Sequence, residues 1–339
     1  MAGDPIMKRT ALFLLLLAGA FGLRSLAATE DSVKTNFTAM PGGTLVVDVD
    51  FGSLQIATHS SNEILVDIER KVSMRTSERE SAFLKDNPIS ITRSGSTLTI
   101  RSRKTSKISW NWSFGSQSTQ ARYLVTVPAE FAANLSTRGG PISVRGLRGA
   151  IKADTSGGGL RFEDTEGELK GTTSGGGIQL KNSKGTLRVE TSGGGIRSEG
   201  GSGSLHADTS GGSVEVKSFG GPVRLHTSGG GIRVESIGGE VFGETSGGSI
   251  HAQIPTPVPG PVHLSSSGGG IELITGASAA FDLDASTSAG GVSCDLPIAS
   301  SGTKHRSHLS GPVNGGGPKV VLETSAGSVR IRSSGAALR

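Results

Sequence analysis

Residues 226–252 read HTSGGGIRVESIGGEVFGETSGGSIHA, and the phrase Thr-Ser-Gly-Gly begins at Thr227 and again eighteen residues later at Thr245. A threonine recurs at the same spacing toward the N-terminus, without an insertion, at Thr137, Thr155, Thr173, Thr191 and Thr209. A fixed period is the signature of a repeat protein, in which each repeat forms one unit that stacks on the next. The period therefore decides the fold class.

Apolar residues lie at two fixed distances from each threonine. Four residues before it stand Ala133, Ile151, Leu169, Leu187, Leu205, Val223 and Val241. Five residues after it stand Ile142, Leu160, Ile178, Ile196, Val214, Ile232 and Ile250. Around both positions apolar and polar residues alternate, which is typical of strands with one buried face. Each period thus predicts two short strands.

Glycines separate the two expected strands. Gly167 and Gly185 lie six residues before a threonine, and pairs such as Gly229 and Gly230 lie two and three residues after one. Because glycine reaches positive φ at little cost, we expect both corners to use that conformation. Two strands and two corners predict an all-β fold, a single-stranded right-handed parallel β-solenoid with coils of about 18 residues, stacked about 4.8 Å apart. The terminal coils and loops are expected to be irregular.

The N-terminal segments differ from the regular repeat. Residues 1–27 have a basic start, an apolar run and small residues before Ala27, which is typical of a secretory signal peptide. Residues 28–130 are predicted to be an N-terminal β region that starts the solenoid, because Val49 can take the place of the threonine. A short helix is expected near residues 77–86 within this region.

The rest of the chain divides into two further segments. Residues 131–255 form the regular repeat, and residues 256–339 are expected to form irregular C-terminal coils with degenerate motifs at Ser266, Thr287 and Thr324. The chain has one cysteine, Cys294, which excludes an intramolecular disulfide. Cys294 follows Val292 by two residues, so it is expected on the buried face of the same strand. After cleavage of the signal, no further apolar segment predicts an integral membrane span.

Three long segments resemble the bacterial putative-adhesin family, a group of exported β-solenoid domains of unknown function. They are PGGTLVVDVDFGSLQIATHSSNEILVDIERKV at residues 41–72, YLVTVPAEFAANLSTRGGPISVRGLRGAIKADTSGGGL at 123–160, and GPVNGGGPKVVLETSAGSVRIR at 311–332. The resemblance covers most of the chain that follows the signal. It implies a periplasmic, cell-surface or secreted location and adhesion, and it supplies no catalytic residues.

Two outward columns of charge are predicted. Eight residues after each threonine the sign alternates, through Arg145, Glu163, Lys181, Glu199, Lys217 and Glu235, which favours the correct register between coils. Three residues before each threonine the column is mostly basic, with Asn134, Lys152, Lys170, Arg188, His206, Arg224, Phe242 and His263. This basic column is either a polyanion-binding surface or a surface neutralised by the acidic residues that lie two positions further along.

An aromatic loop is the other candidate ligand surface. Both tryptophans of the chain, Trp110 and Trp112, alternate with Phe114 beside several arginines and lysines. Aromatic rings with nearby cations suit sugar rings, anionic glycans or a membrane interface. The alternative is that these rings cover the exposed end of the solenoid.

No catalytic, cofactor-binding or metal-binding motif stands out. His305 and His308 lack further ligands at a suitable spacing, and carboxylates occur at interchangeable repeat positions rather than as departures from the repeat. The net charge of +5 is modest and does not indicate a nucleic-acid partner. We therefore predict a non-catalytic envelope protein, without a cofactor, that binds an extracellular glycan or a surface protein. The alternatives are a polysaccharide-processing enzyme of the β-helix type and a structural scaffold; the oligomeric state is not predicted.

Overall fold

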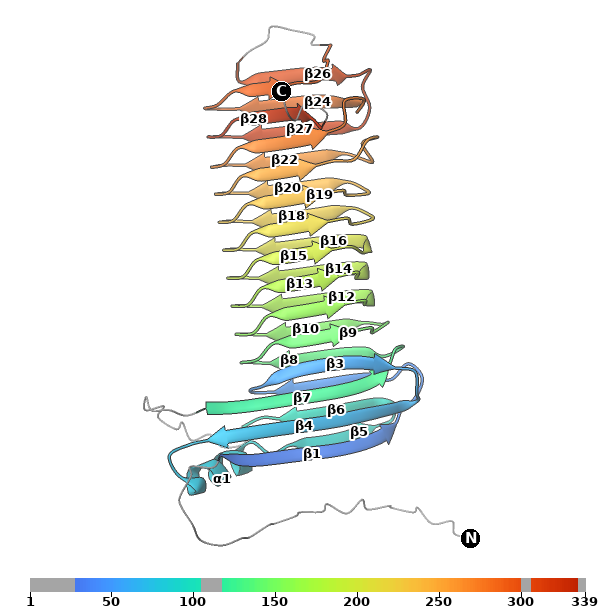
Figure 1. Ribbon diagram of the computed structural model, residues 1–339, viewed down its shortest axis with the longest axis vertical. Coiled ribbons are helices and arrows are strands. Elements are labelled where there is room, and N and C mark those ends of the chain that lie inside the picture. The colour runs from blue at the N-terminus through green and yellow to red at the C-terminus, as the bar shows by residue number, and fades with distance from the viewer. Residues whose placement is uncertain (1–27, 105–117, 300–305, 335–339) are drawn as a thin grey trace.

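The computed structural model describes residues 28–104, 118–299 and 306–334. Within these ranges the chain is all-β apart from one short helix, and its strands form two sheets of 14 strands each in a tall stack (Figure 1). Most neighbouring strands are parallel, as expected for a β-solenoid. Apolar side chains from both sheets form one continuous core between them.

We call the two sheets A and B. Sheet A has the order β1 (Thr29–Thr38), β4 (Glu63–Ser73), β7 (Ser118–Pro128), β3 (Ser53–His59), β9 (Ile142–Arg145), β11 (Leu160–Glu163), β13 (Ile178–Lys181), β15 (Ile196–Glu199), β17 (Val214–Lys217), β19 (Ile232–Glu235), β21 (Ile250–Gln253), β23 (Ile271–Thr275), β28 (Val329–Ser333) and β25 (Val292–Cys294). Sheet B has the order β26 (His308–Val313), β24 (Phe281–Thr287), β27 (Lys319–Thr324), β22 (Val262–Ser266), β20 (Val241–Thr245), β18 (Val223–Thr227), β16 (Ser202–Thr209), β14 (Lys184–Thr191), β12 (Glu166–Thr173), β10 (Ile151–Thr155), β8 (Ala132–Thr137), β2 (Thr44–Val49), β6 (Thr97–Ser102) and β5 (Ser90–Ser94).

The strand pairing follows the register of the threonines. In sheet B, Thr155 lies opposite Thr137 on one side and Thr173 on the other. The prediction that Val49 replaces the threonine in the first part of the chain is confirmed, because Val49 also lies opposite Thr137. Side chains of unequal size complement one another in the core. Phe162 is fully buried, and it fits because a Cβ on Gly171 would lie only 3.1 Å from its ring.

The recurring threonine closes a ladder of hydrogen bonds. Thr191 Oγ1 donates to the carbonyl oxygen of Gly176 in the preceding coil (2.7 Å) and accepts from the N–H of Gly194 (3.3 Å). The same two bonds recur at Thr155, Thr173, Thr209, Thr227, Thr245, Thr287 and Thr324. Ser266 makes both bonds with its own hydroxyl. The phrase Thr-Ser-Gly-Gly therefore repeats because each threonine joins its corner to the neighbouring coil.

The two corners differ in backbone conformation, although close stacking excludes a side chain at both, since a Cβ on Gly185 would lie 2.1 Å from the carbonyl oxygen of Gly167. Before the threonine strand, Gly167 and Gly185 have φ of +126° and +116°, as predicted. After the threonine, the prediction of positive φ is wrong, since Gly193 and Gly194 lie outside that region. A Cβ on Gly194 would instead lie 2.2 Å from the carbonyl oxygen of the preceding coil. Close stacking of the coils excludes a side chain there.

The N-terminal end departs from the parallel stack. β1 pairs with β4, β4 with β7, and β5 with β6 in antiparallel fashion. Helix α1 spans Ser77–Asp86, as predicted, and Thr76 caps it by accepting from the N–H of Arg79. The sequence did not indicate β1, whose inward-facing side chains are only half-buried. Arg70 is buried beneath β1 and pairs there with Asp31.

The C-terminal end stacks its strands out of chain order. β27 lies between β22 and β24, so Thr324 pairs with Ser266 on one side and Thr287 on the other. In sheet A, β28 likewise lies between β23 and β25. β26 pairs with the outer edge of β24 in antiparallel fashion. The chain then returns toward the stack, where its last two strands, β27 and β28, lie inside β24 and β25. Cys294, on β25, is half-buried rather than fully buried.

Candidate functional site

The outer face of sheet B carries a row of basic side chains on five successive strands. These five residues, which we call the basic column, lie opposite one another in register: Lys152 on β10, Lys170 on β12, Arg188 on β14, His206 on β16 and Arg224 on β18. Their neighbours along each strand are buried, so the column points outward. Adjacent strands lie about 4.8 Å apart, and the column repeats its charge at that spacing.

Two cations of the basic column have acidic partners. Lys152 Nζ lies 3.5 Å from Asp154, and an Arg188 guanidinium nitrogen lies 2.7 Å from Glu190. Each partner lies two residues further along the same strand, where the sequence predicted it. Since the lysine and arginine side chains are 55% and 53% exposed, these pairs are solvated and weak.

The other two permanent cations lack such partners. At the position where a carboxylate would follow, Lys170 has Thr172 and Arg224 has His226. Within the described ranges, neither Lys170 nor Arg224 makes an ion pair, and both side chains are exposed. The acidic neighbours therefore neutralise the basic column only in part.

His206 interrupts the run of permanent cations. It is half-buried and lies between Arg188 and Arg224. Burial lowers the pKa of His206, and the nearby positive charge of Arg188 acts in the same direction, while Asp208 and Glu190 oppose the change. The imidazole is therefore harder to protonate than an ordinary histidine.

Beyond Arg224 the column becomes aromatic. The Arg224 guanidinium lies 4.4 Å from the centre of the Phe242 ring, and this ring stacks on His263 with centroids 5.1 Å apart and an interplanar angle of 12°. A cation–π contact restrains the guanidinium without neutralising its charge. Arg224 is thus a positioned cation at the end of the basic column.

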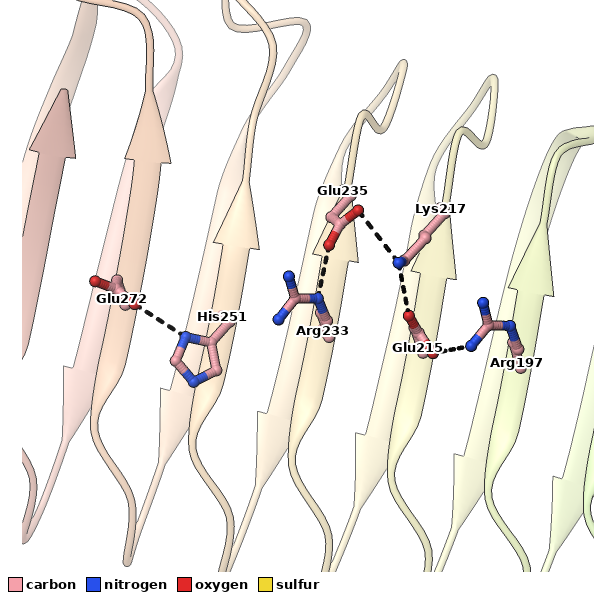
Figure 2. A network of polar contacts seen from close by, with 7 residues as sticks. All are labelled: Arg197, Glu215, Lys217, Arg233, Glu235, His251 and Glu272. Carbon is pink, nitrogen blue, oxygen red and sulfur yellow. Dashed lines mark hydrogen bonds and ion pairs between the residues drawn. The ribbon is translucent and has the colours of Figure 1, made fainter. Parts of the chain in front are cut away.

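The outer face of sheet A carries charges of alternating sign instead. Figure 2 shows Lys217 between Glu215 (3.0 Å) and Glu235 (3.5 Å), and Arg197 paired with Glu215 (2.6 Å). The pair formed by Lys217 and Glu235 confirms, at this position, the alternation predicted from the sequence. The face is largely self-neutralised by these contacts.

Further ion pairs on sheet A were not predicted. Arg161 bonds to Glu163 (2.7 Å) and Arg233 to Glu235 (2.6 Å), two residues apart on one strand. The sequence signal was present as the pattern Arg-X-Glu after a glycine pair and an apolar residue. Alternation places the two side chains on the same face of the strand.

A shallow groove of about 580 Å³ runs beside these pairs. Gly159, Gly177 and Gly195 line it, together with Arg161 and Arg197. Both arginines are already paired with glutamates of their own face. The groove therefore offers less free charge than the basic column.

The aromatic part of the predicted ligand surface cannot be compared with this column. Trp110, Trp112 and Phe114 lie outside the described residues. The preceding strand, β6, ends at Ser102, and the following strand, β7, begins at Ser118.

The described residues offer few groups with the chemistry of an active site. Among them, no three His, Cys, Asp or Glu side chains converge as metal ligands would. Burial raises the pKa of the Cys294 thiol. The pKa of Glu80 is lowered first by the N–H of Met74, a contact that anchors α1. His305 lies outside the described residues. The described part of the chain also holds no helix long and apolar enough to cross a bilayer.

One comparison with known proteins shows the family. A family model described as Toastrack DUF4097 matches residues 44–332. No curated protein matches the sequence.

A solved structure from Clostridium sporogenes, described as a "putative cell adhesion protein", is 12% identical and has a TM-score of 0.22, covering 90% of this chain and 100% of its own. A "putative adhesin" from Bacteroides fragilis is 12% identical with a TM-score of 0.31, covering 89% and 97%. A "putative lipid binding protein" from Parabacteroides distasonis is 11% identical with a TM-score of 0.32, also covering 89% and 97%.

Proposed function

Because this chain belongs to the Toastrack family, we propose that it is a non-catalytic, exported β-solenoid that presents a rigid binding surface to an extracellular glycan or a surface protein. The proposal includes a finer description of the fold, a single-stranded right-handed solenoid with coils of about 18 residues. Two facts support this description. Residues eighteen positions apart, such as Leu160 and Ile178, pair in register, and crossover connections between parallel strands are right-handed in nearly all proteins.

The observation that carries the proposal is the stacking of like charges in the basic column. Lys152 lies opposite Lys170, and Lys170 lies opposite Arg188. Like charges directly opposite on adjacent strands destabilise a sheet. The outer face of sheet A avoids this cost by alternating its charges. An arrangement that lowers stability without improving packing is expected where a protein binds something.

A rigid row of exposed cations suits a partner with several anionic groups. Each contact is weak because it is solvated, but contacts along one surface add through multivalency. We include Trp110, Trp112 and Phe114 in the proposed surface, because aromatic rings beside cations suit sugar rings. Replacing both tryptophans by alanine should abolish retention on glycans and leave the melting midpoint unchanged. A lowered midpoint would assign these rings to a cap instead.

The proposed location is the periplasm, the cell surface or the medium. Residues 1–27 have the three regions of a secretory signal, so the mature chain should begin at Ala28. N-terminal sequencing of the protein from cell fractions tests this expectation. Recovery of an uncleaved chain in the cytoplasmic fraction would contradict it.

The binding surface is tested by retention on a glycan array and on isolated envelopes. The double variant Lys170→Gln, Arg224→Gln removes the two cations without acidic partners, and we expect it to reduce retention about tenfold, a loss of about 1.4 kcal/mol. The matched control is Lys181→Gln, Arg330→Gln, which removes the same charge from exposed positions on sheet A. Equal losses in both variants would refute a role for the basic column.

Two alternative functions give different results in the same assays. Turnover of an acidic polysaccharide, lost on replacing one particular carboxylate, would identify an enzyme of the β-helix type. A scaffold would show neither turnover nor retention.

A further inference from the structure

His206 is the one member of the basic column whose charge changes near neutral pH. It is the fourth of the five members along the column, opposite Arg188 on β14 and Arg224 on β18. When His206 is neutral, three permanent cations on one side are separated from Arg224 on the other. When it is protonated, the column carries a positive charge on five consecutive strands.

The direction of the column restricts the shape of a ligand that can contact all of it. The five side chains come from five different strands, so such a ligand must cross the strands and follow the long axis of the stack. Four strand spacings amount to ~19 Å. A compact anion such as phosphate reaches only neighbouring members, whereas a linear polymer with anionic groups along its length can span the whole column.

We propose that a linear polyanion binds along the basic column, parallel to the solenoid axis, and that its binding is coupled to uptake of a proton by His206. The inference rests on the proposed function, because the same column provides the binding surface. Its consequence is a surface that holds acidic polymers more tightly in mildly acidic surroundings.

The groups around His206 explain why a ligand should change its protonation. The charged and titratable groups that face it come from its own strand and the two strands beside it: Asp208, Arg188, Glu190, Arg224 and His226. Two of these are permanent cations, which oppose a further positive charge. Of the carboxylates, Glu190 is already bonded to Arg188. The free protein therefore disfavours the imidazolium form.

A bound polyanion reverses this balance. Its anionic groups lie over the column, where they offset the flanking arginines and favour the imidazolium form of His206. Binding therefore raises the pKa of His206 and takes up a proton, so affinity increases as pH falls from the pKa of the complex to that of the free protein. Outside this window the affinity does not depend on His206. Each unit by which binding raises the pKa corresponds to about a tenfold change in affinity across the window.

Calorimetric titration with dextran sulfate of defined length tests the proposal. Sulfate esters keep their charge between about pH 5 and pH 8, the range in which histidine titrates, and unsulfated dextran is the control for contacts with the sugar alone. At constant ionic strength we expect the full-length mature protein to bind about tenfold more tightly at low than at high pH in this range. Proton uptake is measured by repeating the titration in buffers with different ionisation enthalpies.

Two histidine variants locate the effect. His206→Asn should bind as the wild type does at the high end of the pH range, but lose the pH dependence and the proton uptake. His226→Asn is the matched control, because His226 lies on the same face outside the basic column and near Glu244. This variant should retain both properties. Circular dichroism of each variant confirms that it is folded.

The outcomes separate the inference from the proposed function. Equal affinity of the wild type across the pH range would overturn the inference, as would a pH dependence that survives in His206→Asn or is lost in His226→Asn. In each of these cases the proposed surface still stands if Lys170→Gln, Arg224→Gln weakens binding. No binding of dextran sulfate, or equal binding by that double variant, would overturn the inference, and the proposed function is then decided separately by retention on the glycan array and on isolated envelopes.

Discussion

Replacing Thr227 by valine tests whether the threonine ladder stabilises the stack. The Thr227 side chain is fully buried, and its hydroxyl donates to the carbonyl oxygen of Gly212 (2.7 Å) and accepts from the N–H of Gly230 (3.2 Å). Valine has nearly the same shape and keeps the methyl contacts. It leaves the carbonyl of one coil and the N–H of the next without these partners.

The expected loss follows from these two bonds. A buried polar group that loses its partner costs about 1–3 kcal/mol, and the corner is close enough to solvent for partial compensation. We therefore expect the valine variant to lose ~2–3 kcal/mol of unfolding free energy. A serine variant keeps both bonds and loses one buried methyl group, at a cost of about 1 kcal/mol. Ser266 demonstrates the geometry, since its hydroxyl makes the equivalent bonds at 2.8 and 2.9 Å.

Urea unfolding followed by far-ultraviolet circular dichroism distinguishes the two variants. Stacked repeats can unfold in parts, so both the midpoint and the slope of each transition are compared. The expected order of stability is wild type, serine variant, valine variant. A valine variant at least as stable as the serine variant would show that packing of the methyl group, and not hydrogen bonding, accounts for the threonine.

Three further tests, with five variants, probe other parts of the structure by the same unfolding assay. Gly194→Ala should prevent folding or lower the midpoint sharply, because its Cβ would lie 2.2 Å from a backbone oxygen, whereas Gly193→Ala, with nearest atoms at 3.4 Å, should fold. Leu187→Asp places an unpaired charge in the core and should abolish cooperative unfolding. Arg197→Ala removes an exposed ion pair and should lower the free energy of unfolding by less than about 1 kcal/mol. Equal effects of the two substitutions would contradict the assignment of inner and outer faces. Because the pKa of His206 is lowered in the folded protein, the unfolded chain binds more protons, so stability should fall as pH drops below the ordinary histidine value of about 6.5. His206→Asn should flatten that part of the curve of midpoint against pH, and an unchanged curve would count against this explanation.

Much of the fold can be predicted from the sequence because the stack repeats one local rule. The spacing of the threonines determines which residues pair, and the alternation around Leu187 determines which of them are buried. The reason for the threonine itself is harder to predict, because it depends on a carbonyl oxygen in another coil. The same is true of Gly194, where the sequence favours a special φ and the actual constraint is the closeness of the neighbouring backbone.

The two ends could not be predicted in the same way. β1 has a weak alternation, and its partner β4 is distant in the sequence. At the C-terminal end, the threonines of β24 and β27 carry similar motifs, so periodicity alone does not determine which of the two strands lies next to β22. Which strands pair across a long loop depends on which of several strand edges offers the better partner. A local sequence pattern carries no information about that competition.

The position of the candidate site and much of its charge balance could be predicted from the sequence, but its side-chain stacking could not. The register placed Lys170 and Arg224 in one outward column. The sequence also distinguishes Arg188, which Glu190 follows by two residues, from Arg224, which His226 follows. It does not indicate that the Arg224 guanidinium stacks on Phe242, because this contact depends on the conformation of two side chains on adjacent strands.

The C-terminal strand order also limits how this protein can be made and how it can change in length. A chain that emerges from the ribosome or the translocon N-terminus first can add coils one at a time from β8 to β23. β24 and β25 receive their final neighbours only after β27 and β28 have been synthesised and have entered between them and the finished stack. If a coil of the regular repeat is duplicated or lost, the new contacts between neighbouring coils resemble the contacts that they replace. The five strands of this interleaved end, β24 to β28, by contrast, have to be inherited together.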